Sequence, residues 1–192
     1  MEVGLTVKCF TDTCDFLLVT PQPDVIRGLK ALFDADCHRP GGPLPRVTDP
    51  LIIGPEQTRD RLTRFLESAR ESISVVDDRV TDPQILDLLE SKRRSGVKVR
   101  ILGRGDLAGM ACHGRMITTD NRRAIIGSVA LSKSSLDSRR EVAVVIDEPD
   151  CLQKLSRLFD HCAAHARRPV SEESIGLGDD DDYGDENDDE SD

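Results

Sequence analysis

The sequence has few aromatic residues and no long apolar run, and each shortage argues against a class of protein. Aromatic residues make up 3% of the chain and tryptophan is absent, so the stacking side chains that usually bind single-stranded nucleic acid are scarce. The longest apolar runs are only a few residues, too short to span a bilayer. The first residues, MEVGLTVKCF, carry neither the basic region nor the apolar region of an export signal. We therefore expect a cytoplasmic protein without a transmembrane segment.

Paired cysteines are also missing, because the six cysteines are scattered and no two form a CxxC motif. A chain of this length needs no disulfide framework, so reduced thiols are expected. His161 and His165 stand four apart, a spacing that can bind zinc on a helix, with Cys162 nearby. No third ligand cluster and no HExxH arrangement accompanies them. We therefore predict no metal and no cofactor.

The net charge of −10 comes from one end of the chain. Residues 179–192, DDDDYGDENDDESD, hold ten acidic residues and no basic one. Without them, the remaining 26 acidic residues equal the 26 Lys and Arg. A balanced body without excess basic charge makes nucleic acid a less favoured partner. The stretch 169–192 is acidic and poor in apolar residues, which predicts a disordered tail.

The stretch from 112 to 141, CHGRMITTDNRRAIIGSVALSKSSLDSRRE, is where residue types and spacing together indicate a reaction. His113 and Arg115 are two apart in a β-branched run, so on a strand both side chains would leave the same face. This would put a nucleophile beside a cation. Asp120-Asn121 predicts a tight turn, and residues 124–126 predict the returning strand of a hairpin.

Three further residues end or begin the strands that follow. Gly127 and Ser128 stand where the backbone can approach a ligand and a hydroxyl can donate to an oxyanion. Glu141 precedes a predicted strand, Val142–Ile146, where a carboxylate can fix the tautomer of an imidazole.

The pattern His113-x-Arg115-x4-Asp120-x6-Gly127-Ser128, with Glu141 downstream, resembles the HxK(x)4D(x)6GSxxN signature of the phospholipase D superfamily. Arg115 stands for the lysine and Leu131 for the asparagine. The resemblance implies His113 as nucleophile or acid, Arg115 and Ser128 as phosphate binders, Asp120 as a supporting carboxylate and Glu141 as the residue that orients histidine. It also implies a phosphohistidine intermediate and a second motif in the same site.

An internal repeat precedes this motif. A shift of 126 residues lays DFLLVTPQPDVIRGLKALFD, from Asp15, over EVAVVIDEPDCLQKLSRLFD, from Glu141. Both copies predict a strand, a proline-containing turn and an amphipathic helix. We therefore predict a partial phospholipase D-like repeat over 1–39, a Pro/Gly-rich linker over 40–50 and a near-complete repeat over 51–168. The first His-x-Lys stretch is missing, which truncation, decay or pairing of two chains would each explain.

The second repeat predicts an α/β fold, with a mixed sheet flanked by helices. Residues 57–72 carry apolar residues on one helical face, and residues 73–76 and 97–102 read as strands. Asp82-Pro83 predicts a helix start and Gly96 a helix end, which favours a parallel strand-helix-strand unit.

Three functions remain open from the sequence. The first is a phosphodiesterase or phosphatidyltransferase acting on a phosphodiester, with phospholipid favoured, in which a homodimer supplies the second histidine. The second is a non-catalytic phosphate-binding or interaction module of the same fold, and the third is a nuclease. The first function could be regulated by the acidic tail, which would fold back over Arg115 and nearby arginines and suppress the site.

Overall fold

The computed structural model describes residues 7, 11–38, 49–103, 106–107 and 110–166. The predicted linker 40–50 lies almost wholly outside these residues, and the predicted acidic tail lies entirely outside them. In chain order, the elements are β1 (Thr13–Cys14), α2 (Pro23–His38), β2 (Leu51–Ile53), α3 (Thr58–Glu67), β3 (Ser72–Val76), α4 (Pro83–Arg94), β4 (Lys98–Leu102), β5 (Asp106–Leu107), β6 (Met110–Cys112), β7 (Arg115–Thr119), β8 (Arg123–Gly127), α5 (Lys133–Asp137), β9 (Val142–Ile146) and α6 (Pro149–His165).

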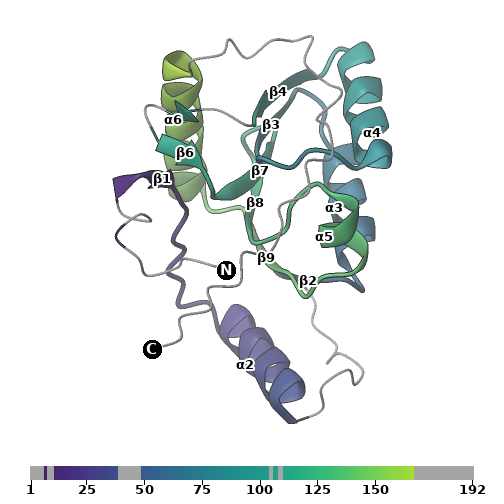
Figure 1. The fold of residues 1–192 in the computed structure, drawn as a ribbon, viewed down its shortest axis with the longest axis vertical. Coiled ribbons are helices and arrows are strands. Elements are labelled where there is room, and N and C mark those ends of the chain that lie inside the picture. Colours follow the sequence, from purple (N-terminus) through teal and green to yellow (C-terminus); the bar gives the residue numbers. More distant parts are fainter. Residues whose placement is uncertain (1–6, 8–10, 39–48, 104–105, 108–109, 167–192) are drawn as a thin grey trace, which may run out of the picture.

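The centre of the molecule is a six-stranded sheet in the order β2-β9-β8-β7-β3-β4. Strands β3 and β4 run parallel, joined through α4, and every other neighbouring pair is antiparallel. The sheet is therefore mixed, and the prediction of an α/β fold with a mixed, helix-flanked sheet is confirmed. Figure 1 shows α3, α4 and α5 on one side of this sheet and α6 on the other.

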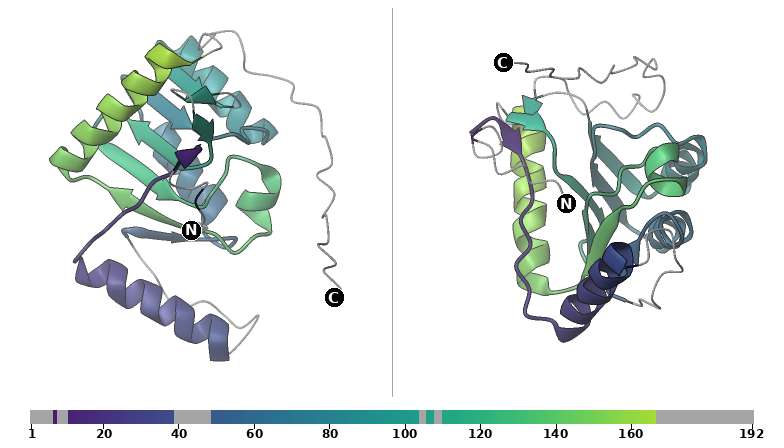
Figure 2. Two further views of the ribbon diagram at one scale, coloured as in Figure 1. Left: turned by 60° about the vertical axis from the view of Figure 1, so that its left-hand side comes forward. Right: turned by 60° about the horizontal axis from the view of Figure 1, so that its bottom comes forward.

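The sheet buries apolar side chains on both faces. Residues of α3, α4 and β3 form one cluster with Leu131 and Leu136. Residues of α6, including Phe159, form the other cluster with Met116 and Ala124. The two layers of helix account for the short apolar strand sequences, since a strand covered on both faces has no polar side. Figure 2 shows α2 set apart from both layers, near the β2 end of the sheet.

Helix α4 begins where the sequence predicts a helix, because its first turn is capped. The Asp82 carboxylate accepts the Ile85 N–H at 3.1 Å, and Pro83 stands at a position that needs no donor. Gly96 follows the last turn with φ +91°, a conformation that costs other residues a steric penalty. The helix thus starts and ends at positions fixed by local chemistry.

The hairpin β7–β8 also follows its sequence. Asp120 and Asn121 both adopt positive φ, 54° and 50°, as the central residues of a type I′ turn do, and the Arg122 N–H donates to the Thr119 carbonyl at 3.0 Å. The register pairs Arg115 with Gly127 and Thr119 with Arg123. The turn therefore places Arg115 at the far end of the hairpin, beside the end of β8.

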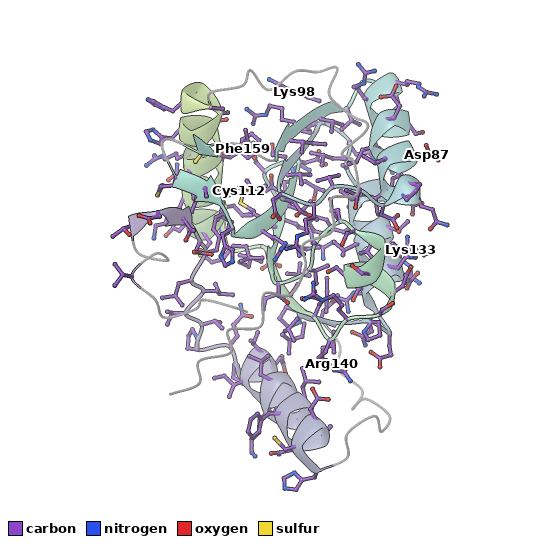
Figure 3. The ribbon with its side chains drawn as sticks, in the orientation of Figure 1. Asp87, Lys98, Cys112, Lys133, Arg140 and Phe159 are labelled. Atoms are coloured by element: carbon purple, nitrogen blue, oxygen red, sulfur yellow. The ribbon has the colours of Figure 1, made fainter. Side chains whose placement is uncertain are left out.

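A second, three-stranded sheet in the order β1-β6-β5 lies before β7. Its strand β1 comes from the N-terminal region and runs parallel to β6, with Cys14 opposite Cys112. The predicted strand over 15–20 does not form in the described chain, because residues 15–22 belong to neither sheet. The N-terminal segment is nevertheless placed directly against the residues that precede β7, as Figure 3 shows.

Candidate active site

His113 lies between two strands rather than within one. Strand β6 ends at Cys112 and β7 begins at Arg115, so the prediction that His113 and Arg115 share a strand is wrong. The break is held by the N-terminal segment, since the Gly114 N–H donates to the Cys14 carbonyl at 2.7 Å. A side chain at position 114 would meet Phe16 and the Cys14 carbonyl, so glycine allows this close approach.

The partner of His113 is Asp15, from the segment predicted to be a partial repeat. Nδ1 of His113 lies 2.5 Å from Oδ1 of Asp15, and the Thr13 hydroxyl donates to the other oxygen at 2.5 Å. The Asp15 carboxylate is 13% exposed while the imidazole is 44% exposed. A carboxylate on Nδ1 fixes the tautomer and leaves Nε2 directed away from its partner. Sequence reasoning missed Asp15 as a site residue, although the repeat alignment pairs it with Glu141.

Glu141 does not take the predicted position beside His113. Its carboxylate is buried behind the loop before α5, where the Ser135 hydroxyl donates to Oε1 at 3.0 Å. Arg139 lies 3.8 Å from the same oxygen. The Ser135 oxygen in turn accepts the Ala130 N–H at 2.8 Å. In this structure Glu141 therefore holds α5 and the loop that precedes it, and Asp15 takes its place as the acceptor for His113.

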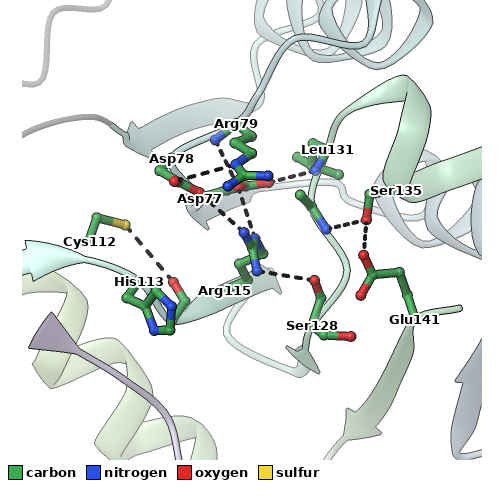
Figure 4. Close-up of polar contacts among 12 residues, drawn as sticks. Asp77, Asp78, Arg79, Cys112, His113, Arg115, Ser128, Leu131, Ser135 and Glu141 are labelled. Atoms are coloured by element: carbon green, nitrogen blue, oxygen red, sulfur yellow. Dashed lines mark hydrogen bonds and ion pairs between the residues drawn. The ribbon is translucent and has the colours of Figure 1, made fainter. Parts of the chain in front are cut away.

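Arg115 is surrounded by oxygen atoms of the chain itself (Figure 4). Nη1 donates to the Ser128 carbonyl at 3.2 Å, and Nη2 lies 3.5 Å from Oδ1 of Asp78. Nε faces Oδ1 of Asp77 at 3.5 Å and makes no hydrogen bond there. The guanidinium is 20% exposed. A phosphate that binds Arg115 must therefore compete with the Asp78 carboxylate.

Asp77 anchors this cluster from the end of β3. Its Oδ2 accepts the Leu131 N–H at 2.6 Å, and its Oδ1 accepts the Arg79 N–H at 2.9 Å. Burial raises the pKa of Asp77 to about 6, and the two backbone donors and Arg115 oppose that rise without cancelling it. Asp77 is thus a buried carboxyl that titrates close to neutral pH, in contact with the cation of the motif.

The raised pKa of Asp77 gives a pH dependence with a definite sign. The folded state holds the Asp77 proton more tightly than the unfolded chain, so this group lowers the free energy of unfolding as pH rises from about 4 to about 6. The slope is at most about 1.4 kcal/mol per pH unit. Urea unfolding of wild type and Asp77→Asn between these pH values measures the contribution of Asp77, because the difference between their free energies of unfolding should change with pH. A constant difference between the two proteins would contradict it.

Gly127 and Ser128 serve the sheet as well as the site. A Cβ at Gly127 would stand 2.2 Å from the Val142 carbonyl oxygen, so glycine is required for the approach of β9. The Ser128 hydroxyl accepts the Val142 N–H at 3.1 Å. The same hydroxyl also donates to the Val142 carbonyl at 3.5 Å, so an anion that binds Ser128 must replace this long contact. Leu131, at the asparagine position of the signature, is fully buried.

Asp120 lies at the opposite end of β7 from Arg115, and its carboxylate binds backbone N–H groups. Its carboxylate accepts the N–H groups of Arg70, Glu71 and Ser72 at 2.9, 2.7 and 2.8 Å. Burial acts to raise its pKa, but these donors prevail and hold the pKa of Asp120 below its usual range. Its position identifies it as the anchor of the turn before β3.

We expect Asp120→Ala to lower the free energy of unfolding by about 2–3 kcal/mol, since three backbone donors lose their acceptor. Asp120→Asn keeps an acceptor and tolerance of positive φ, so its cost should be clearly smaller. Urea midpoints of both variants test this, with the exposed Asp147→Ala as control. Equal losses in all three would show that the Asp120 contacts contribute little.

Cys112 and the two helix histidines give no second reactive centre. Burial first, and then Asp78 and Asp77, raise the pKa of Cys112 to about 12, so its thiol stays protonated at neutral pH. His161 and His165 stack at 4.4 Å on the exposed face of α6. Within the described part of the chain, His, Cys, Asp and Glu side chains nowhere gather in the threes that a metal ion needs.

Comparisons with known proteins identify the fold. Residues 106–163 match the family model described as cardiolipin synthase, phospholipase D-like domain. The chain has a phospholipase D-like fold. The structure resembles Nuc from Salmonella typhimurium, a phospholipase D family member, with TM-score 0.56, 22% identity, and coverage of 63% of this chain and 97% of Nuc.

Two further solved structures resemble this chain. NucT from Helicobacter pylori gives TM-score 0.51 and 18% identity, over 60% of this chain and 95% of NucT. Polyphosphate kinase from Porphyromonas gingivalis gives TM-score 0.61 and 16% identity, over 73% of this chain and 26% of the kinase. No curated protein sequence matches the chain. Among the described helices, none has the length and apolar character needed to cross a bilayer.

Proposed function

We propose that the protein is a phospholipase D-type phosphodiesterase or phosphatidyltransferase that works through a phosphohistidine on His113. The observation that carries the proposal is the contact between His113 Nδ1 and Asp15 at 2.5 Å. It holds a half-exposed imidazole in the tautomer whose Nε2 lone pair is free to attack. The carboxylate also stabilises the positive charge that the ring acquires when Nε2 bonds to phosphorus.

The reaction proceeds in two displacements at phosphorus. Nε2 of His113 attacks the phosphodiester, the bond from phosphorus to one ester oxygen breaks, and the departing alkoxide takes a proton from an acid. Water then attacks the phosphohistidine, which releases a phosphate monoester and restores the imidazole. An alcohol in place of water gives phosphatidyl transfer. Ser128 and Arg115 stabilise the charge on the non-bridging oxygens.

The acid for the leaving group comes from a second histidine. The sequence has four histidines. His38 lies at the end of α2 and the other two lie in the last turns of α6, bound locally to backbone or stacked on one another. The contacts that the structure shows for these three side chains are with their own helices or with each other, and the contact of the His113 ring is with Asp15. We therefore place the second imidazole on another copy of the chain, so that a homodimer brings two His113 side chains to one phosphodiester.

Phospholipid is the substrate we favour. The matched family model is described by a cardiolipin synthase domain, and phosphatidyl transfer is the reaction that this description implies. A nuclease of the same mechanism differs only in substrate. The near-equal numbers of acidic and basic residues outside the tail and the scarcity of aromatic residues favour lipid over nucleic acid.

A non-catalytic phosphate-binding module is the second candidate, and the surroundings of Arg115 favour it. The guanidinium already faces Asp77, Asp78 and the Ser128 carbonyl. A phosphate must displace Asp78 before it can bind in the bidentate way that arginine prefers. Such a site would bind phosphate esters weakly and would not turn them over.

Hydrolysis of bis(p-nitrophenyl) phosphate by wild type and His113→Ala tests the proposal. We expect a rate in the wild type, loss of that rate in the variant, and an acid-labile phosphate on the wild-type protein after quenching. His161→Ala, an exposed histidine on α6, is the matched control and should keep the wild-type rate. A folded wild type that shows neither rate nor phosphoenzyme would favour the binding module.

A further inference from the structure

The Asp78 carboxylate contacts two arginine side chains at the candidate site. Its Oδ1 atom lies 3.5 Å from Nη2 of Arg115, and its Oδ2 atom lies 3.7 Å from Nε of Arg79. Figure 4 shows both guanidinium groups beside this carboxylate. Each oxygen of a single carboxylate therefore faces a different cation.

Asp78 is held less firmly than its neighbour Asp77. The Asp77 side chain is 2% exposed and accepts two backbone N–H groups, at 2.6 and 2.9 Å. The Asp78 side chain is 30% exposed, follows the end of β3, and meets its two arginines only at 3.5 and 3.7 Å. Exposed ion pairs of this length contribute little to stability. Asp78 can therefore turn toward solvent while the fold remains intact.

Asp77 fixes the two arginines relative to each other. Its Oδ1 atom accepts the backbone N–H of Arg79 at 2.9 Å and faces Nε of Arg115 at 3.5 Å. The Arg79 side chain is 53% exposed, and its ion pair in the described structure is the one with Asp78. Arg79 is thus fixed at its backbone, while its guanidinium group is accessible to a ligand that replaces Asp78.

Asp78 also lies close to the loop that carries His113. Burial first, and then the charge of Asp78, raise the pKa of the Cys112 thiol, and Cys112 directly precedes His113. Arg115, the other residue that flanks this two-residue loop, contacts Asp78 directly. The space that Asp78 occupies is therefore next to the proposed nucleophile.

We infer that Arg79 is a second phosphate-binding residue, and that the Asp78 carboxylate stands where the phosphodiester binds. A phosphodiester, like a carboxylate, shares one negative charge between two oxygen atoms, and guanidinium groups bind both anions in the same way. The two non-bridging oxygens would replace the two Asp78 oxygens, one beside Arg79 and one beside Arg115. The identity of the ligand rests on the proposed function.

The charges of the cluster fit this exchange. The side chains of Arg79 and Arg115 face those of Asp77 and Asp78, so the charges balance when both acids are ionised. When Asp78 turns outward, the two arginines and Asp77 leave one positive charge, which matches the single negative charge of a phosphodiester. Asp77 remains against Arg115 and keeps its guanidinium group in place.

Binding of dimethyl phosphate to the full chain, followed by NMR titration at fixed ionic strength, tests the role of both residues. Asp78→Asn keeps the shape of the side chain and removes its charge, so we expect a Kd about tenfold lower than that of the wild type. In the Asp78→Asn protein, Arg79→Gln should raise Kd by about 10- to 100-fold, the range for a lost hydrogen bond to a charged group. Arg79→Lys should restore part of that loss, because lysine keeps the charge without the planar fork.

The Asp78→Asn protein separates two possible roles of Arg79. If Arg79 only neutralised Asp78, its replacement would affect binding in the wild type and have no effect once residue 78 is uncharged. Arg64→Gln is the matched control, because Arg64 is an exposed arginine of α3 that pairs with Asp60 at 2.7 Å. We expect it to change Kd by less than about twofold, since exposed distant charges are screened. Urea midpoints check that each variant is folded.

Three results would overturn the inference. The first is an Asp78→Asn protein that binds dimethyl phosphate no more tightly than the wild type. The second is an Arg79→Gln substitution without effect in the Asp78→Asn protein, and the third is an equal loss in Arg64→Gln. Binding is measured without turnover, so any of these leaves the His113-dependent hydrolysis result standing. Conversely, the expected binding in a protein that hydrolyses no phosphodiester rejects the proposed catalysis and supports the role of Arg79.

Discussion

Asp15→Asn is expected to lower kcat for phosphodiester hydrolysis by roughly 10³–10⁴-fold, the loss seen when a histidine-orienting carboxylate becomes an amide. The amide oxygen or nitrogen can still lie at 2.5–3 Å from Nδ1, but an amide does not stabilise the charged ring, and its NH2 group favours the wrong tautomer. Because Asp15 touches no substrate atom in the proposed reaction, KM should change far less than kcat. Steady-state kinetics of the two proteins measure the split.

Glu141→Gln is the comparison that decides which carboxylate serves His113. Glutamine can still accept the Ser135 hydroxyl, which now donates to Oε1 of Glu141 at 3.0 Å. We therefore expect a small kinetic effect from Glu141→Gln and a large one from Asp15→Asn. The reverse order would show that Glu141 orients the catalytic imidazole and that the Asp15 contact is incidental. The exposed Asp147→Asn controls for a general change in charge.

The sequence predicted those elements whose ends are determined by local residues, without help from the rest of the fold. The N-cap at Asp82, the proline that follows it and Gly96 set α4 within a residue or two, because each satisfies or ends a turn locally. The Asp120-Asn121 turn set the β7–β8 hairpin in the same way. Residues 15–20 failed to form the predicted strand because no strand of the described chain pairs with them.

The partner of His113 could not be found from motif spacing, because the contact spans 98 residues. The downstream acidic residue of the motif is Glu141, and the resemblance to the family signature assigned it to His113. The repeat contained the needed signal, since Asp15 and Glu141 coincide under the 126-residue shift. Which of two equivalent carboxylates meets a given imidazole depends on how the segments pack, and β1 pairing with β6 settles it here.

Arg115 illustrates a different limit of the sequence. Replacement of a lysine by arginine adds N–H groups that must be satisfied. Asp77 and Asp78, which stand 38 and 37 residues earlier, face those groups at 3.5 Å. Neither acid belongs to the motif, so the sequence offered no reason to join them to it. Changing Arg115 alone to lysine keeps the positive charge but removes the planar fork of N–H groups that faces both carboxylates.

Leu131→Asn, which restores the signature, is expected to unfold the protein more than it repairs the site. Leu131 is fully buried in the cluster that joins α3, α4 and α5 to the sheet. Asparagine there leaves part of the leucine volume empty and buries an amide among apolar side chains. We expect a loss of about 3–5 kcal/mol in the free energy of unfolding.

Urea unfolding of Leu131→Asn and Leu131→Met separates the effect of a buried amide from the effect of a changed side-chain shape. Methionine keeps the apolar volume, so Leu131→Met should lower the free energy of unfolding by less than about 1.5 kcal/mol. The backbone N–H of residue 131 would still reach Asp77, which now accepts it at 2.6 Å, so neither variant alters the charge around Arg115. If Leu131→Asn kept wild-type stability and raised the hydrolysis rate, residue 131 would have to face the phosphate site. The burial of Leu131 predicts the opposite, namely that this position belongs to the core and that the proposed site works without an amide there.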